Sequence, residues 1–93
     1  MAFDKNLDQN LFSETKEFET TRLTVGVFSY NGGEKKLQIS RENRNQEGQW
    51  SFAKAGRMFK DEVEAIVPLM QKALEEMNAL ADIFLEAINK DDP

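Results

Sequence analysis

The hydrophobic period of this chain changes once, close to residue 61. In RLTVGVFSY (residues 22–30), Leu23, Val25 and Val27 alternate with other side chains, the period of two expected when one face of a β-strand is buried. From residue 63 onward, apolar residues recur at alternating steps of three and four, the heptad pattern of an amphipathic helix. We therefore expect strands first and one long helix afterwards. The heptad positions are Val63, Ile66, Met70, Ala73, Met77, Leu80, Phe84 and Ala87.

Turn-forming residues divide the first part into strands. Asn-Gly-Gly at residues 31–33 tolerates positive φ, and it predicts a hairpin that joins 22–30 to a second strand at 35–43. The polar segment 44–49 predicts a longer turn before a third strand in WSFAKAGRMF (50–59). Residues 9–18 carry a weaker strand signal. The predicted fold is α+β, with an antiparallel sheet of three to four strands followed by one long C-terminal helix.

The predicted helix begins at Asp61 and ends near Asn89. Asp61 has Glu64 three positions later, a capping-box arrangement in which Asp replaces Ser or Thr. Pro68 lies inside the pattern. It predicts a kink or a restart, because proline removes one backbone hydrogen bond.

A second apolar row, at Val67, Leu74, Ala81 and Ile88, widens the stripe of this helix. A helix of about 28 residues is roughly 42 Å long, more than one small sheet covers. We expect a homodimer to bury the remainder; the alternative is a single helix that lies wholly on its own sheet. The predicted dimer interface comprises Met70, Leu74, Met77, Leu80, Ala81, Phe84 and Ile88.

The composition excludes most catalytic chemistries. The chain of 93 residues is long enough for one domain with a modest core, and it contains neither cysteine nor histidine. Thiol nucleophiles, thiolate zinc sites and the usual near-neutral proton shuttle are therefore excluded. We expect no catalytic residue, no metal site and no cofactor, and we expect that the protein is not an enzyme. The acids Glu62, Glu64, Glu75 and Glu76 are expected to form a solvated helix face.

The expected single domain comprises an N-terminal extension or first strand (1–20), the sheet (21–60), the helix (61–89) and a tail (90–93). No apolar run approaches the roughly 18 residues that span a bilayer. The segment MAFDKNLDQN has neither the basic start nor the apolar centre of a signal peptide. We expect a soluble protein without a membrane partner, cytoplasmic in a bacterial or phage-infected cell and nuclear in a eukaryote.

Positive charge is concentrated in the middle of an acidic chain. The net charge is −5, yet residues 21–60 carry eight basic side chains against three acidic ones. Residues 61–93 carry two basic side chains against nine acidic ones. This segregation favours a basic surface on the predicted sheet, although a scatter of cations that only balances neighbouring acids is the alternative.

Strand parity predicts where these cations lie. If Leu23, Val25 and Val27 face the helix, then Arg22, Phe28 and Tyr30 occupy the open face of the sheet, and the Asn-Gly-Gly turn brings Lys35 and Lys36 beside them. Cations that follow phosphates and rings that stack on unpaired bases are typical of single-stranded nucleic-acid binding.

Two alternatives stay open in the sequence. Trp50, Phe52 and Lys54 join the open face if Ala53 and Ala55 turn inward; otherwise the two aromatic residues are core. Arg41 shares the parity of the core-facing residues of its strand. We therefore expect either that it lies beyond the part covered by the helix or that a bulge reverses its direction.

VFSYNGGEKKLQISRE, QEGQ, FAKAG and an acid-started helix occur here in that order. Across about residues 22–80 this order resembles the single-stranded DNA-binding domain of the positive cofactor 4 family of transcriptional coactivators, including its bacterial and phage members. The resemblance implies a curved antiparallel sheet and one helix that dimerises. It also implies that two antiparallel single strands are held on paired β-ridges.

The resemblance assigns roles to individual residues. Tyr30 matches the aromatic residue that closes the first ridge strand, Lys35 or Lys36 matches the basic residue after the glycine turn, and Arg41 matches the Arg of an Arg-Glu pair. Lys54 matches a basic residue before a glycine. The family's aromatic residue after Arg-Glu is replaced by Asn43 and Arg44. The Ser- and Lys-rich arm of the eukaryotic members is absent, and the helix is extended.

Together these observations predict a largely sequence-independent single-stranded DNA-binding protein that acts on opened DNA in replication, recombination or transcription. The sequence does not distinguish DNA from RNA. The alternative is an adaptor whose acidic helix docks replication or transcription proteins. The predicted nucleic-acid-binding residues are Arg22, Phe28, Tyr30, Lys35, Lys36, Arg41, Arg44, Trp50, Phe52, Lys54 and Arg57.

Overall fold

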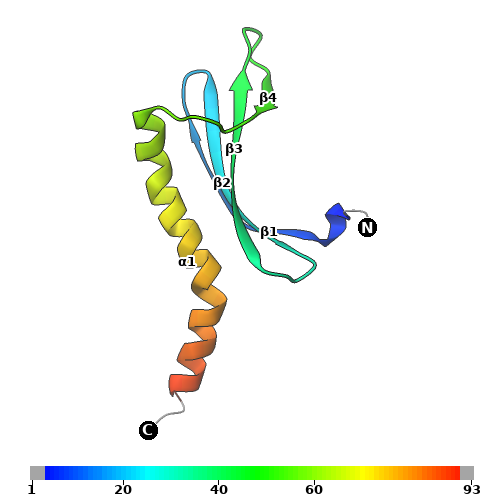
Figure 1. The fold of residues 1–93 in the computed structure, drawn as a ribbon, viewed down its shortest axis with the longest axis vertical. Helices are drawn as coiled ribbons and strands as arrows, with labels where there is room; N and C mark the ends of the chain where they lie inside the picture. Colours follow the sequence, from blue (N-terminus) through cyan, green and yellow to red (C-terminus); the bar gives the residue numbers. More distant parts are fainter. Residues whose placement is uncertain (1–3, 91–93) are drawn as a thin grey trace.

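The computed structural model of the chain describes the backbone of residues 4–90 and the side chains of residues 4–78. A four-stranded antiparallel sheet in the order β1-β2-β3-β4 is followed by one helix, α1, which packs against one face of the sheet (Figure 1). The predicted α+β class is confirmed. The elements are a short 3-10 helix (Lys5–Leu7), β1 (Asp8–Glu17), β2 (Thr21–Tyr30), β3 (Lys35–Arg44), β4 (Trp50–Ala53) and α1 (Lys60–Lys90).

The core lies between β2 and the first half of α1. Leu23, Val25 and Val27 are fully buried, as their alternation predicts. They contact Ile66, Leu69 and Ala73 of the helix, and half-buried residues of β1, β3 and the loop before α1 close the edges of this cluster. Burial of a large aliphatic side chain contributes roughly 1.5–3 kcal/mol, so this narrow layer is what holds α1 on the sheet.

The β2–β3 hairpin forms at the predicted Asn-Gly-Gly turn. Asn31 and Gly32 adopt φ values of 50° and 71°, as the turns that match strand twist require. The N–H of Gly33 donates to the carbonyl of Tyr30 at 2.8 Å. In the β3–β4 turn, the Asn45 side chain accepts hydrogen bonds from two backbone N–H groups.

The weak strand signal in residues 9–18 corresponds to β1, a full-length edge strand. Its pairing with β2 shifts between Asn10 and Phe12, so that Leu11 is an extra residue in the ladder. Because of this bulge, Asn10 lies opposite Phe28 and Phe12 lies opposite the buried Val27. The strand is polar because, away from Phe12, most of its side chains reach solvent.

The third predicted strand is shorter than expected. β4 ends at Ala53, whereas the sequence predicted strand structure as far as Phe59. The pairing with β3 stops where Ala53 meets Arg41. Beyond it, the carbonyl of Ala55 accepts from the Arg41 guanidinium, and a positive φ of 54° at Gly56 redirects the chain toward α1.

The helix begins at Lys60, one residue before the predicted start. The capping partner differs from the prediction, because Glu62 Oε1, not Glu64, accepts the backbone N–H of Phe59 at 2.8 Å. The helix continues through Pro68, so the expected restart does not occur. Pro68 is exposed, where a missing N–H is least costly.

The two faces of α1 differ from the heptad prediction. The sheet-facing row is Glu62, Ile66, Leu69, Ala73 and Met77, so Leu69 replaces Val63 and Met70 on that side. A parallel row remains exposed, and we name it the helix stripe: Val63, Val67, Met70 and Leu74.

The helix also continues past the end of the sheet (Figure 1). The predicted interface residues Leu80, Ala81, Phe84 and Ile88 lie outside the side chains that the structure describes. Within the described residues, no helix is both long enough and apolar enough to cross a membrane.

Candidate nucleic-acid interface

The sheet surface opposite α1, which we name the open face, gathers aromatic and basic side chains from three strands. Directly paired residues of an antiparallel sheet share a face. Arg22 lies opposite Glu42, and Glu42 lies opposite Phe52. Arg44 lies opposite Trp50 in the next row of the same face.

Trp50 belongs to the open face. The alternative in which Trp50 is a core residue is therefore excluded. The Arg22 guanidinium lies 4.2 Å from the centroid of its ring, and that of Arg44 lies 5.4 Å away. Both are cation–π distances. Arg22 is also held by Glu42, with 2.7 Å between Nε and Oε1, and this hydrogen bond raises the pKa of Arg22 further.

Phe52 projects from the same face and is 83% exposed. An exposed single hydrophobic residue is common, but an exposed ring one row from Trp50 extends an aromatic surface. It is the most exposed of the large hydrophobic side chains identified in the described part of the chain. A base that stacks on this ring would displace few protein side chains, because most of the ring is exposed to solvent.

Phe28 supplies a second ring at the other end of β2. Its ring lies over Gly26, where an added Cβ would come within 2.8 Å of Phe28 Cε2. Glycine at this position therefore allows the ring to lie along the strand. Lys36 lies directly opposite Phe28 on β3, so a ring and an ammonium group are adjacent on the open face. Tyr30 is farther along β2, and its hydroxyl accepts the backbone N–H of Asp4.

Lys35 does not lie with Lys36. It pairs with the buried Ser29, which places it on the helix side. There its Nζ donates to the backbone carbonyls of Glu76 and Met77, at 3.3 Å each. The expectation that the turn brings both lysines to one surface is wrong, because adjacent residues of a strand point to opposite faces.

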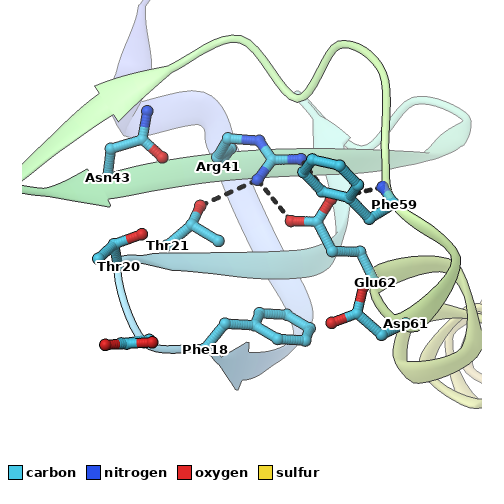
Figure 2. A pocket seen from close by; sticks show the side chains of 9 residues that line it. Phe18, Thr20, Thr21, Arg41, Asn43, Phe59, Asp61 and Glu62 are labelled. Carbon is cyan, nitrogen blue, oxygen red and sulfur yellow. Dashed lines mark hydrogen bonds and ion pairs between the residues drawn. The ribbon is translucent and has the colours of Figure 1, made fainter.

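Arg41 also lies on the helix side. Neither alternative that the sequence left open applies, because the pairing of β2 with β3 shows no register shift and the first turn of α1 covers this end of the strand. Arg41 Nη1 lies 2.7 Å from Glu62 Oε2, and Nη1 also donates to Thr21 Oγ1 at 2.9 Å (Figure 2). The geometry therefore removes Arg41 from the group of side chains on the open face.

The ion pair of Arg41 and Glu62 is largely shielded from solvent, with side-chain exposures of 11% and 5%. The hydrogen bond from Arg41 holds the pKa of the Glu62 carboxyl below its usual value, and the hydrogen bond from the Phe59 N–H acts in the same direction. Glu62, expected among the solvated helical acids, is therefore a buried structural carboxylate. The sequence signal for this role is the position of Glu62 three residues after Phe59, the residue that directly precedes the helix.

A groove lies beside this pair, between the β1–β2 turn and the start of α1 (Figure 2). Its walls include Phe18, Asn43 and Asp61, together with Phe59, whose side chain is 78% exposed. The groove is on the helix side of the sheet, away from the open face. Its floor is closed by the Arg41–Glu62 pair, which is already satisfied internally.

The remaining predicted cations lie near the end of β3 and after β4. Arg44 Nη2 donates to the carbonyl of Glu19 at 2.7 Å, which fixes the guanidinium beside Trp50. Lys54 and Arg57 are exposed in the connection from β4 to α1. In the part of the chain that the structure describes, no group of three or more acidic side chains is arranged to hold a metal ion.

Comparison with known proteins yields no match: no family model, no curated protein and no solved structure matches this chain. The resemblance to the positive cofactor 4 family therefore rests on the order of the sequence motifs.

Proposed function

We propose that this protein binds single-stranded DNA on the open face of its sheet, largely without regard to sequence, and acts on opened DNA in replication, recombination or transcription. The observation that carries the proposal is the exposed ring of Phe52 beside a tryptophan flanked by two guanidinium groups. Exposed rings offer stacking surfaces for unpaired bases, worth roughly 1–3 kcal/mol per base.

The electrostatics of the open face support the same proposal. Lys36 is exposed directly opposite Phe28, Lys54 is exposed just after the end of β4, and Arg44 places hydrogen-bond donors near the aromatic surface. Arg22 contributes less net charge, because Glu42 neutralises it. Lys36 beside Phe28 and Arg44 beside Trp50 would contact phosphates while the neighbouring rings stack on bases.

We further propose that two copies associate through α1. The helix stripe leaves four apolar side chains between 40% and 57% exposed, next to the core that β2 and α1 form. A second helix would cover the stripe and leave both open faces accessible. This arrangement doubles the nucleic-acid surface, which raises the apparent affinity for a strand that reaches both faces.

The test is a binding assay at several salt concentrations that compares single-stranded with duplex DNA of equal length. We expect preferential binding of the single strand, because duplex bases are not available for stacking, and a linear decrease of log affinity with log salt. Equal affinity for both forms, or tight binding that ignores salt, would reject the proposal. An RNA strand of the same sequence measures the preference between DNA and RNA.

A second candidate function is an adaptor whose helix docks a replication or transcription protein. The exposed helix stripe favours it, since the stripe accepts a foreign apolar surface as well as a second copy. The two functions separate in one experiment: a partner interaction that survives Lys36→Gln and Phe52→Ala but fails with Leu74→Glu supports the adaptor.

A further inference from the structure

The open face contains a hollow at the end of the β2–β3 hairpin, which we name the hairpin pocket. Its volume is about 360 Å³, near the lower limit of the roughly 300–1,000 Å³ typical of small-molecule sites. It is lined by Asp8, Phe28, Tyr30, Gly33, Glu34 and Lys36.

The strand register explains the walls of the hairpin pocket. Asp8 of β1 lies directly opposite Tyr30, and Lys36 of β3 lies directly opposite Phe28. Two rings from β2 are therefore flanked by a carboxylate on one side and an ammonium group on the other. Glu34 adds a second carboxylate from the hairpin connection.

The charged groups of the pocket, Asp8, Glu34 and Lys36, are available to a ligand. Among the side chains of residues 4–78, none forms a hydrogen bond or ion pair with the side chain of Asp8, Glu34 or Lys36. Carboxylates accept hydrogen bonds and donate none, whereas ammonium groups only donate. The carboxylates therefore repel phosphate but accept N–H groups of a base, and Lys36 is the group that can contact an adjoining phosphate.

We propose that the hairpin pocket binds an unpaired guanine, a proposal that rests on the proposed function and gives it one preferred base. Guanine is the base whose Watson–Crick edge presents two adjacent donors, N1–H and the exocyclic amino group, which match the two oxygens of one carboxylate. Thymine presents one N–H between two carbonyl oxygens, which a carboxylate repels. Phe28, held over Gly26, offers the stacking surface.

The experiment measures fluorescence anisotropy of the full chain at one salt concentration with three oligonucleotides of equal length. The first contains thymine alone, the second contains isolated guanines among thymines, and the third has inosine at the guanine positions. We expect the guanine oligonucleotide to bind at least about fivefold more tightly than the thymine one, the lower end for a bidentate base contact. Inosine should lose most of this gain, since it lacks the exocyclic amino group.

Variants assign the gain to the pocket. Asp8→Asn should bring the ratio of guanine to thymine affinity close to one while binding of the thymine oligonucleotide is kept. Glu34→Gln, in the exposed hairpin connection, is the second variant and does not depend on the folding of β1. Glu47→Gln, in the other hairpin turn, removes the same charge far from the pocket and should leave the ratio unchanged.

The outcomes separate the two proposals. Thymine binding without a guanine gain, or a gain that both Asp8→Asn and Glu34→Gln preserve, overturns the guanine site and leaves the proposed function standing. A protein that binds none of the three oligonucleotides overturns the proposed function, and the guanine site with it.

Discussion

Arg41 of β3 and Glu62 of α1 join the sheet to the helix through an ion pair in which Nη1 lies 2.7 Å from Oε2. The same guanidinium donates to Thr21 and to the carbonyl of Ala55, so one side chain connects β2, β3, the segment after β4 and α1. Glu62 in turn accepts the N–H of Phe59 and caps the helix. The pair therefore fixes where α1 begins relative to the sheet.

The first prediction concerns the stability of this connection. Glu62→Ala leaves the Arg41 guanidinium largely buried without its counter-ion, so we expect a loss of roughly 3 kcal/mol in the free energy of unfolding. Urea denaturation at neutral pH measures it. Glu64→Ala, on the exposed side of the same helix turn, is the matched control and should change stability little.

The second prediction concerns pH. Because the pKa of Glu62 is lower in the folded protein than its usual value of 4.5, the unfolded chain binds the proton more readily. The contribution of Glu62 is fully present above pH 4.5 and is lost as pH falls through the lower folded pKa. Urea denaturation between pH 7 and pH 3 should show a steeper decline for the native chain than for Glu62→Gln. Parallel curves would contradict this assignment.

The third prediction separates two exposed rings. Phe52→Ala should weaken single-stranded DNA binding by about 1–3 kcal/mol, because it removes one stacking surface from the open face. Phe59→Ala removes a ring of similar exposure from the helix side and should leave affinity unchanged. Isothermal titration with a single-stranded oligonucleotide measures both variants. Equal losses of affinity in the two variants would contradict the assignment of DNA binding to the open face.

The fourth prediction uses Gly26. A Cβ at this position meets the Phe28 ring at 2.8 Å, so Gly26→Ala should push the ring away from its position along the strand. We expect weaker DNA binding than in the native chain, although every aromatic and basic side chain is kept. The quenching of Trp50 fluorescence by a single-stranded oligonucleotide reports it. Restored affinity in Gly26→Ala combined with Phe28→Leu would mean that the ring contributes no stacking.

The fifth prediction concerns salt dependence. Lys36→Gln should reduce the slope of log affinity against log salt by about 0.7, the value for one phosphate contact on a single strand. Lys16 lies opposite Leu23 and is exposed on the helix side, so Lys16→Gln should keep the slope. A slope that is equally reduced by both variants would indicate that only the total charge matters.

Local patterns determined much of this fold. The alternation of Leu23, Val25 and Val27 identifies the buried face of β2, and Asn31 with Gly32 adopts the positive φ values that the hairpin requires. The recurrence of apolar residues after residue 61 predicts the helix to within one residue at each end. These features depend on neighbours in the sequence, so the sequence alone is enough to predict them.

The side chains that make up the candidate site were harder to predict from the sequence than the fold. Parity placed Arg22, Phe28 and Tyr30 on one face correctly, but it left Trp50 and Phe52 undecided, since β4 has only four residues and no apolar set of its own. The position of Trp50 depends on its pairing with Arg44 and on the guanidinium of Arg22, which come from two other strands.

By itself, the sequence determined β2 and β3, the turn between them, the helix and the side of β2 that is buried, because each follows from contacts between residues close in the chain. Only the tertiary structure decided the partners of the charged side chains. Arg41 and Lys35 face the helix because α1 supplies a carboxylate for one and backbone carbonyls for the other. An alternating pattern gives a side chain its face, but the group it meets there comes from a distant segment and depends on how the elements pack.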